Sequence, residues 1–415
     1  MVNNDDFFKG KKPAAVLKHA VFTSYAYAFC SMIGSGHTGP LWLVDGYAGP
    51  GKYDADADGA QVNGSPIVAL TLAAKQRSFA TPRDVRCAFI EANQAYALAL
   101  SENIKPFVDE GLRADVYQGD VAEHLPTVWS RAVNNPVLTF IDPFGVSAVS
   151  KDVMTGTLLK PGRTAPSEVL VNINVEAISR HGGYLQWDSH HDPEIRRGLK
   201  PHGVELSDAF FGGEWWRRAF LEARDRTGDA SAAAIEVVDA YRVMIKEETG
   251  ASSLAVPIRR SPTGAMLFHF TLFFTHPAAA YKFADSASKG TEKWREAFRR
   301  KDLEEALSPG NGQGTLFDDD LREFSEKDAK LREDQLQAAA IAHIEGNISA
   351  LIAPMQSGHG VQLAPNIERL VGAYLSLAGE PAIRRAWDNL ADAGLVRARD
   401  KSKSRSMWKQ YIVKR

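Results

Sequence analysis

Cysteine is scarce in this sequence, because only Cys30 and Cys87 occur among its 415 residues. Two cysteines exclude a disulfide framework, and both lie in apolar patterns typical of buried thiols, so we expect a reducing, cytoplasmic compartment. No apolar stretch approaches the length that spans a bilayer, and the first residues lack the basic and apolar segments of a secretion signal. We therefore expect no membrane partner.

Net charge is also nearly absent, with 49 Lys and Arg against 51 Asp and Glu. This balance excludes a global basic field, so any surface for nucleic acid has to be local. Histidines and acids gather between residues 181 and 192, but their spacing matches no structural zinc pattern and no cysteine accompanies them. We expect no metal site there.

Composition divides the chain into three parts, and its length favours more than one domain. Residues 1–285 read as strands alternating with helices, with a helical insertion at about 180–232. Residues 286–333 are highly charged and include a Pro-Gly-Asn-Gly-Gln-Gly run that cannot sustain a helix, which predicts a linker with short exposed helices. Residues 334–415 return to a compact helical pattern and end in a basic, strand-like tail.

Four segments of the first part read as strands that end in, or lead into, an acid. The acids are Asp45, Glu91, Asp120 and Asp142. Apolar runs of this kind are typical of buried parallel strands, and ligands bind at the carboxyl edge of such sheets. We therefore expect the four side chains at one ligand-binding edge; the alternative is that they are ordinary strand-end turns.

The loop after the first strand is rich in glycine. Gly46, Tyr47, Gly49 and Gly51 lie in the run Asp-Gly-Tyr-Ala-Gly-Pro-Gly. Glycines let a backbone approach a ligand closely and tolerate positive φ. The spacing is G-x-x-G-x-G rather than G-x-G-x-x-G, and the next helix begins too late to cap a pyrophosphate, so a nicotinamide-binding dehydrogenase is disfavoured.

This order of elements, closed by an expected hairpin of residues 254–258 and 267–274, resembles the class I S-adenosylmethionine-dependent methyltransferase fold, a Rossmann-like seven-stranded α/β sheet. Val-Leu-Lys-His at 16–19, before the strand that enters the glycine loop, resembles the large-subunit ribosomal-RNA adenine-N6 methyltransferases. Residues 1–285 as a whole are similar to the three-Cys-motif partner proteins, through segments 7–9, 44–51, 64–66, 141–145 and 268–288. That family name implies a partner, encoded nearby, that carries a three-cysteine motif and is related to iron–sulfur or radical enzymes.

The cofactor implied by the resemblance is S-adenosyl-L-methionine. Asp45 can accept a hydrogen bond from its amino group, Glu91 from both ribose hydroxyls, and Asp120 from the adenine amino group. The resemblance to the rRNA enzymes places Lys18 and His19 over the ligand, with Lys18 toward a carboxylate. The alternative for these two residues is the polar stripe of a helix.

Asp142-Pro143-Phe144-Gly145 is the candidate reaction centre. Amino-methyltransferases carry an Asp, Asn or Ser, then Pro-Pro and an aromatic residue at this place. The side chain and the following carbonyl accept the two amino protons, which positions the nitrogen for transfer. Here Asp142 can still accept and Phe144 can stack, although the second proline is replaced. The alternative is a buried turn shaped by Pro143 and Phe144.

Residues 334–415 resemble a winged helix-turn-helix domain of the α+β class. Two amphipathic helices are expected at 336–344 and 367–377, and a third at 381–394, between Pro381 and Gly394. Short strands at 395–399 and 407–413 would flank a basic turn. Such a unit docks its third helix in the major groove and sets the wing against phosphate.

Five cations of this part are candidates for contact with DNA or RNA. They are Arg384 and Arg385 on the third helix, and Lys401, Lys403 and Arg405 in the wing, which could neutralise phosphates. The alternative is a winged helix that docks a protein and carries a solvated basic tail.

Together these features predict an S-adenosylmethionine-dependent methyltransferase that acts on nucleic acid, at an exocyclic base amino group. Two alternatives stay open. The departure at Phe144 and Gly145 favours a regulator that binds S-adenosylmethionine and DNA without catalysis. A neighbouring gene for a protein with three spaced cysteines would favour an assembly subunit whose winged helix binds that partner.

Overall fold

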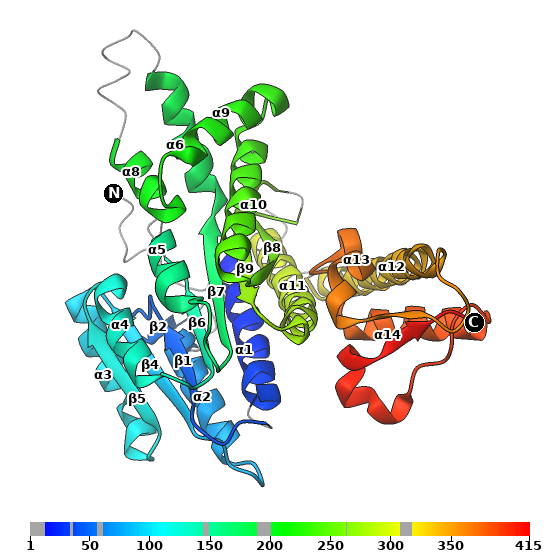
Figure 1. The fold of residues 1–415 in the computed structure, drawn as a ribbon, viewed down its shortest axis with the longest axis horizontal. Helices are drawn as coiled ribbons and strands as arrows, with labels where there is room; N and C mark the ends of the chain where they lie inside the picture. Colours follow the sequence, from blue (N-terminus) through cyan, green and yellow to red (C-terminus); the bar gives the residue numbers. More distant parts are fainter. Residues whose placement is uncertain are drawn as a thin grey trace. The chain divides into compact units, whose positions relative to one another are not determined.

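The computed structural model describes residues 13–33, 36–55, 61–143, 149–188, 201–262, 264–307 and 318–415 (Figure 1). It divides into two compact units, which are described separately. The first contains Ala26–Thr275, and the second contains His276–Arg415 together with residues 13–25, the first part of the first helix. Helix α1 (Pro13–Ile33) contributes to both units. The main division falls at residue 275, earlier than the predicted end of the first domain at 285.

A seven-stranded sheet forms the centre of the first unit, in the order β5-β4-β1-β6-β7-β9-β8. Its strands are β1 (Leu41–Asp45), β4 (Val85–Glu91), β5 (Arg113–Gln118), β6 (Val137–Ile141), β7 (Ser167–Asn174), β8 (Ser252–Arg259) and β9 (Met266–Phe274). The first five positions are parallel, whereas β9 runs antiparallel to both of its neighbours. This topology confirms the predicted Rossmann-like methyltransferase sheet with its closing hairpin.

Both faces of the sheet are covered by helices, which explains why its central strands are continuous apolar runs. Helices α2 (Ser65–Arg77) and α3 (Gln94–Asp109) pack on β1, β4 and β5, and α4 (Val121–Arg131) contributes Leu125 and Val128 to the core of the opposite face. The short α5 (Lys151–Val153) continues into a π-helical turn, Met154–Leu158. Gly64 is the N-cap of α2, and Ser65 is its first helical residue.

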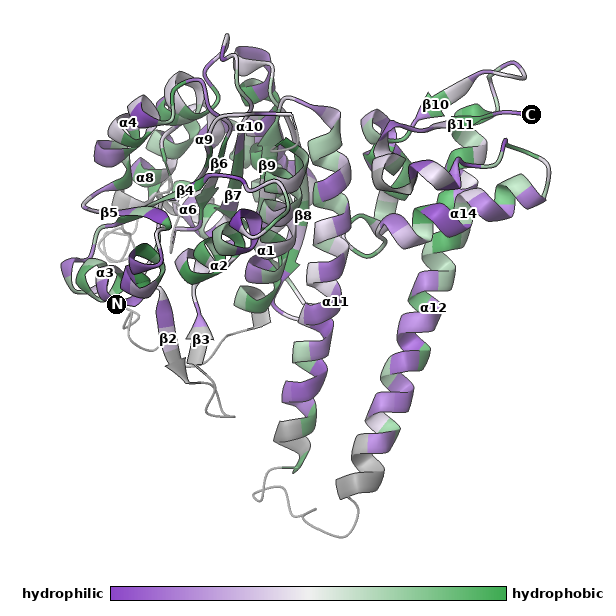
Figure 2. Ribbon diagram, turned by 90° about the horizontal axis from the view of Figure 1, so that it is seen from below, coloured by the Kyte–Doolittle hydropathy of each residue, from purple (hydrophilic) through white to green (hydrophobic). Residues whose placement is uncertain are grey.

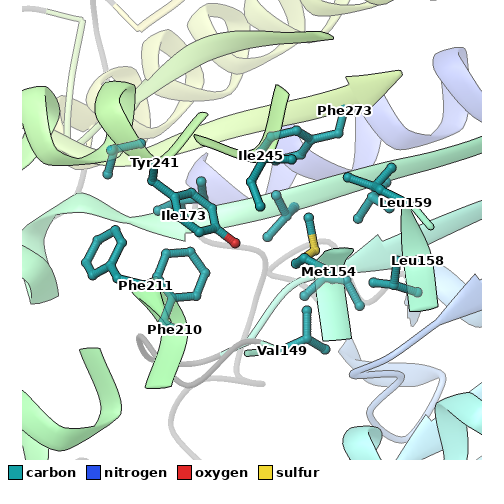
Figure 3. Close-up of a cluster of buried hydrophobic side chains, with 14 of the residues drawn as sticks. Val149, Met154, Leu158, Leu159, Ile173, Phe210, Phe211, Tyr241, Ile245 and Phe273 are labelled. Atoms are coloured by element: carbon teal, nitrogen blue, oxygen red, sulfur yellow. The ribbon is translucent and has the colours of Figure 1, made fainter. Parts of the chain in front are cut away.

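The predicted insertion is helical and extends further than expected. It consists of α6 (Val175–Asp188), α8 (Pro201–Phe211), α9 (Trp215–Thr227) and α10 (Ala230–Thr249). Figure 3 shows aromatic side chains of this insertion beside Ile173 of β7, and the rings of Phe210 and Tyr241 lie 4.9 Å apart. Trp216 is fully buried in the same core.

Two long helices dominate the second unit. Helices α11 (Pro277–Leu307) and α12 (Asp318–Ile352) lie side by side (Figure 2). Arg295 of α11 forms a bidentate ion pair with Glu333 of α12, at 2.8 Å, and both side chains are mostly buried. The predicted linker at 286–333 is therefore wrong for its described residues. The high charge reflects solvated helix faces and ion pairs between and along the helices rather than an extended chain.

The remainder of the second unit is a small helical module with a two-stranded sheet. It contains β10 (Gly360–Gln362), α13 (Ile367–Val371), α14 (Glu380–Asp392) and β11 (Tyr411–Val413), with 3₁₀ turns at Ala364–Asn366, Gly372–Tyr374 and Lys401–Lys409. Strands β10 and β11 are antiparallel, and Val396 forms a single bridge with Lys414.

Three boundaries of this module differ from the sequence-based expectation. The helix expected at 336–344 is part of the much longer α12, and that expected at 367–377 is broken at Gly372, which has a φ of 50°. The strand expected at 395–399 is reduced to the Val396 bridge, and β11 starts at Tyr411 because 3₁₀ turns occupy Lys401–Lys409. Within the described residues, no helix is long and apolar enough to cross a membrane.

Close helix contact in the second unit depends on Gly290 of α11. A Cβ atom there would lie 2.4 Å from Cγ2 of Val21 and 3.3 Å from the carbonyl oxygen of Leu17, both on α1. Gly346, inside α12, has open space at the same position. The two glycines therefore form a matched pair, one required by packing and one not.

We expect Gly290→Ala to lower the free energy of unfolding by about 1–3 kcal/mol, because the added methyl group forces α1 and α11 apart. Gly346→Ala should raise it by about 0.5–1 kcal/mol, since alanine favours the helix and meets nothing. Thermal unfolding of the two full-length variants checks both signs. A Gly290→Ala protein as stable as Gly346→Ala would contradict the packing.

Candidate functional site

Strand register brings three of the four predicted acids to one face of the sheet. Asp45, the last residue of β1, pairs with Phe89 of β4 and Phe140 of β6. Residues two apart on a strand share a face, so Glu91 and Asp142 lie on the same side of the sheet as Asp45. Each is two residues closer to the carboxyl edge than the partner of Asp45 on its strand. This is the face on which α2 and α3 pack.

A fourth polar side chain, missed in the sequence, completes this edge. Asn172 of β7 follows Val171, which pairs with Ile141, so it stands beside Asp142. Its Nδ2 donates a hydrogen bond of 2.8 Å to Oδ1 of Asp142. Asn172 is 1% exposed. The sequence feature that could have pointed to Asn172 is a polar residue inside an otherwise apolar run, because buried polar residues are rare unless they are hydrogen-bonded.

Asp45 is the most perturbed acid of the site. It is buried, and Oδ1 accepts the N–H of Tyr47 at 3.1 Å. Burial raises the pKa of Asp45 to about 7; the nearby Ser65 hydroxyl and the Tyr47 N–H lower it in part, and the negative charges of Asp142 and Glu91 raise it. Oδ2 is also buried, and no described group makes a hydrogen bond of normal geometry to it. A cationic group at this position would stabilise the carboxylate.

The glycine loop after β1 folds back on the ends of the neighbouring strands. Gly46 donates to the Phe140 carbonyl at 2.9 Å. Gly49 has a φ of 63° and donates its N–H to Oε2 of Glu91 at 2.8 Å. Gly51, with a φ of 80°, accepts from the N–H of Gly64 at 2.7 Å. The loop is therefore closed at its base, and positive φ at two positions explains the need for glycine.

Glu91 is fixed by backbone on both oxygens. Besides the Gly49 contact, its Oε1 accepts the N–H of Asn93 at 2.7 Å, at the start of α3. An ionised carboxylate has about four acceptor sites, so both oxygens can accept further hydrogen bonds. The carboxylate is thus oriented in advance and partly exposed, as a ligand with two hydroxyls requires.

Asp120 and Tyr47 mark the far side of the same edge. Asp120 is exposed, and its Oδ1 caps α4 by accepting the N–H of Ala122 at 2.8 Å. Burial and the charge of Asp120 raise the pKa of the Tyr47 hydroxyl. The glycine loop therefore reaches from the end of β1 toward the end of β5, beside which Asp120 lies.

A β-hairpin, also missed in the sequence, brings a second tyrosine into the site. Strands β2 (Lys52–Ala55) and β3 (Gln61–Asn63) pair within the loop between β1 and α2. Tyr53 lies against Gly64, where an added Cβ would be 3.3 Å from its ring. Burial raises the pKa of Tyr53, and the charges of Asp142, Asp45 and Glu91 raise it further. The tyrosine is therefore close to all three acids.

The remaining predicted site residues do not belong to the strand ends that carry these acids. Lys18 and His19 lie on α1 in the second unit, 6% and 9% exposed. Pro143 is buried next to Asp142, whereas Phe144 lies outside the described residues. In the histidine-rich segment at 181–192, Nδ1 of His181 lies 2.8 Å from the hydroxyl of the buried Ser207, with which it forms a hydrogen bond. No group of three or more potential ligands occurs in the described part of the chain.

The predicted nucleic-acid cations differ in their availability. Arg384 forms an ion pair with Glu380 one turn earlier on α14. Arg385 and Lys401 are exposed, and Lys403 is exposed but pairs with Asp400 at 3.2 Å. The side chain of Arg405 lies outside the described residues.

Comparison with known proteins gives only distant similarity. No family model and no curated protein matches the chain. A Legionella pneumophila protein of family DUF519 is 13% identical over 63% of this chain and 85% of its own, with a TM-score of 0.31. An O-methyltransferase from Bacillus cereus, solved in complex with SAH, is 11% identical over 65% of this chain and 94% of its own, with a TM-score of 0.28.

The raised pKa of Asp45 makes stability depend on pH. Between pH 4 and 7 the folded protein holds a proton that the unfolded chain loses, so the free energy of unfolding falls as pH rises through this window. Asp45→Asn removes this dependence. At pH 8 the variant should be about 1–4 kcal/mol more stable than the wild type, and at pH 4 about equal.

Denaturant unfolding at the two pH values measures the difference. Asp109→Asn is the control, because Asp109 is an exposed acid of α3 paired with Lys105. Its effect should stay below about 0.5 kcal/mol at either pH. Equal stability of the wild type and Asp45→Asn at pH 8 would show that the Asp45 carboxylate carries no burial cost.

Proposed function

We propose that this chain is an S-adenosylmethionine-dependent methyltransferase that acts on nucleic acid, at an exocyclic base amino group. The observation that carries the proposal is the cluster of Asp45, Glu91 and Asp142 on one face of a methyltransferase-type sheet, below a glycine loop closed onto Glu91. Such a cluster favours a cationic ligand and disfavours a phosphate.

The residues present fit this cofactor. The buried Oδ2 of Asp45 is suited to accept from its ammonium group, and Glu91, already oriented by two N–H groups, is suited to its ribose hydroxyls. Asp120 would accept from the adenine amino group. The cofactor supplies a methyl group bound to a positively charged sulfur. Acids on the surrounding strand ends stabilise that charge in the bound state.

Asp142 is the residue proposed to orient the acceptor. Its carboxylate, held by Asn172, can accept a hydrogen bond from an amino N–H and turn the nitrogen lone pair toward the methyl carbon. Transfer forms a nitrogen–carbon bond, breaks the carbon–sulfur bond with its electron pair left on sulfur, and releases one amino proton to water. A base in a duplex would first have to leave the helical stack.

The small module of the second unit supports the choice of nucleic acid. Its order is helix α12, strand β10, helices α13 and α14, the Val396 bridge, a basic loop and strand β11, which resembles a winged helix. Residues 380–415 contain ten Lys and Arg against four Asp and Glu. A local excess of positive charge on a neutral chain fits phosphate contact. Because Arg384 is paired with Glu380, Arg385 and the basic loop are the better candidates for contact with phosphate.

Cofactor binding is tested first, by isothermal titration of the full-length protein. We expect binding of S-adenosylmethionine or its demethylated product, and about 100-fold weaker binding in Glu91→Ala, because two hydrogen bonds to a charged carboxylate are lost. Glu102→Ala, an exposed acid of α3, should bind within about twofold of the wild type. No detectable heat at millimolar ligand would reject the cofactor.

Nucleic-acid binding is tested on the full chain with Lys401, Lys403 and Arg405 all replaced by Ala. Binding to any DNA or RNA sequence should weaken, and the slope of log K against log salt should become shallower by about two to three. The control replaces Lys327, Lys330 and Arg332, three exposed cations of α12. An equal effect in the control would mean that the wing has no special role.

A further inference from the structure

We infer that Asn172 and Asp142 both accept hydrogen bonds from the acceptor nitrogen, so that the site selects a primary amino group over a singly methylated one. The inference rests on the proposed function and adds a specificity-determining residue to it. It derives from one hydrogen bond, between Asn172 of β7 and Asp142 after β6, and from the buried amide oxygen of Asn172.

The hydrogen bond fixes the orientation of the amide. Nδ2 of Asn172 lies 2.8 Å from Oδ1 of Asp142. The reversed amide would place two acceptor oxygens against each other, with no proton between them, so the carboxylate itself selects the donor end. The amide oxygen of Asn172 must then point away from this contact.

That oxygen is left without a donor. Oδ1 of Asn172 is buried and accepts no hydrogen bond from any described residue. A buried carbonyl oxygen without a partner is destabilising, and native proteins keep few of them. Asn172 also lies on the same face as Asp45, Glu91 and Asp142, at the edge where the ligand is expected. A ligand donor is therefore the natural partner of this oxygen.

The surroundings of the pair restrict what that donor can be. On the same face, Phe270 of β9 lies beside Asn172, and Phe140 precedes Asp142 on β6. Their rings meet edge to face at 6.2 Å and offer no polar hydrogen to the amide oxygen. The proposal therefore assigns the donor to a ligand at the carboxyl edge of the sheet, where the acceptor base would enter.

Two neighbouring acceptors match the two protons of a primary amino group. One N–H would go to the Asp142 carboxylate and the other to Oδ1 of Asn172. A hydroxyl or a monomethylated amine has one proton and would leave one acceptor buried and unpaired. Loss of such a partner is what makes polar sites selective. The site should therefore discriminate against its own product and stop after one methyl group.

The test measures binding of single-stranded oligonucleotides to full-length protein saturated with the demethylated cofactor. Each probe carries one adenine, N6-methyladenine or N6,N6-dimethyladenine, and a parallel series carries cytosine and N4-methylcytosine. We expect wild-type protein to bind the primary amine at least about tenfold more tightly than its methylated forms in one of the two series. The series in which this occurs identifies the base.

Asn172→Leu keeps the size of the side chain and removes both amide functions. It should bind methylated and unmethylated probes within about twofold of each other, while its affinity for S-adenosylmethionine stays within about twofold of the wild type. If Asn172→Leu is unstable, Asn172→Ser replaces it in the test. The serine side chain is too short to reach both Asp142 and the acceptor nitrogen, so this variant should also lose the discrimination between probes. Thr139→Val is the control, since it removes a buried oxygen on the opposite face of β6 and should keep the discrimination.

The outcomes separate the two proposals. Wild-type protein that binds the cofactor but treats all probes alike would overturn the role of Asn172 and leave the methyltransferase proposal in place. Discrimination that persists in both Asn172→Leu and Asn172→Ser would overturn it as well. Protein that fails to bind S-adenosylmethionine at all would overturn the proposed function, and this inference with it.

Discussion

Parallel register is the constraint on which the site depends. Because β4, β1, β6 and β7 run in the same direction and alternate their side chains in phase, residues far apart in sequence emerge on one face at one edge. A one-residue slip in any strand would turn its polar end residue into the opposite, apolar core. The buried strands therefore do more than stabilise the fold, since their pairing determines the geometry of Asp45, Glu91, Asp142 and Asn172.

The electrostatics of this edge limit the ligand. Asp45 is buried, and the charges of Glu91 and Asp142 make its ionisation still less favourable. Burying a carboxylate costs free energy unless a cation or donors compensate it. A dinucleotide brings a pyrophosphate, which would add to the negative charge, whereas a ligand with an ammonium and a sulfonium group would relieve it. The charge of the site thus agrees with the glycine spacing in disfavouring a dehydrogenase.

Much of this sheet could be predicted, because buried parallel strands have an unmistakable composition. The closing hairpin was predicted at 254–258 and 267–274 and is found there as β8 and β9. The hairpin of β2 and β3 was not, since its glycine- and aspartate-rich sequence shows no alternation. Asn172 was not predicted for the opposite reason, because four of the seven other residues of β7 are apolar and the strand reads as core. Its role depends on Asp142, thirty residues away, and only pairing of the strands reveals it.

Charge misled the prediction for the second unit. Alternating acids and bases at 286–333 suggested a solvated linker, but the same pattern suits long helices whose outer faces are solvated and whose inner faces pair, as Arg295 does with Glu333. A similar distinction applies to the C-terminal cations. Arg399 is mostly buried and held by Asp388, so it stabilises the module and is less available to phosphate. Among the cations predicted to contact nucleic acid, those left exposed are Arg385 on α14 and Lys401 and Lys403 on the loop. Under the proposed function, such a surface would bind a phosphate backbone through the number of its charges, and recognition of the base would be left to the site on the sheet.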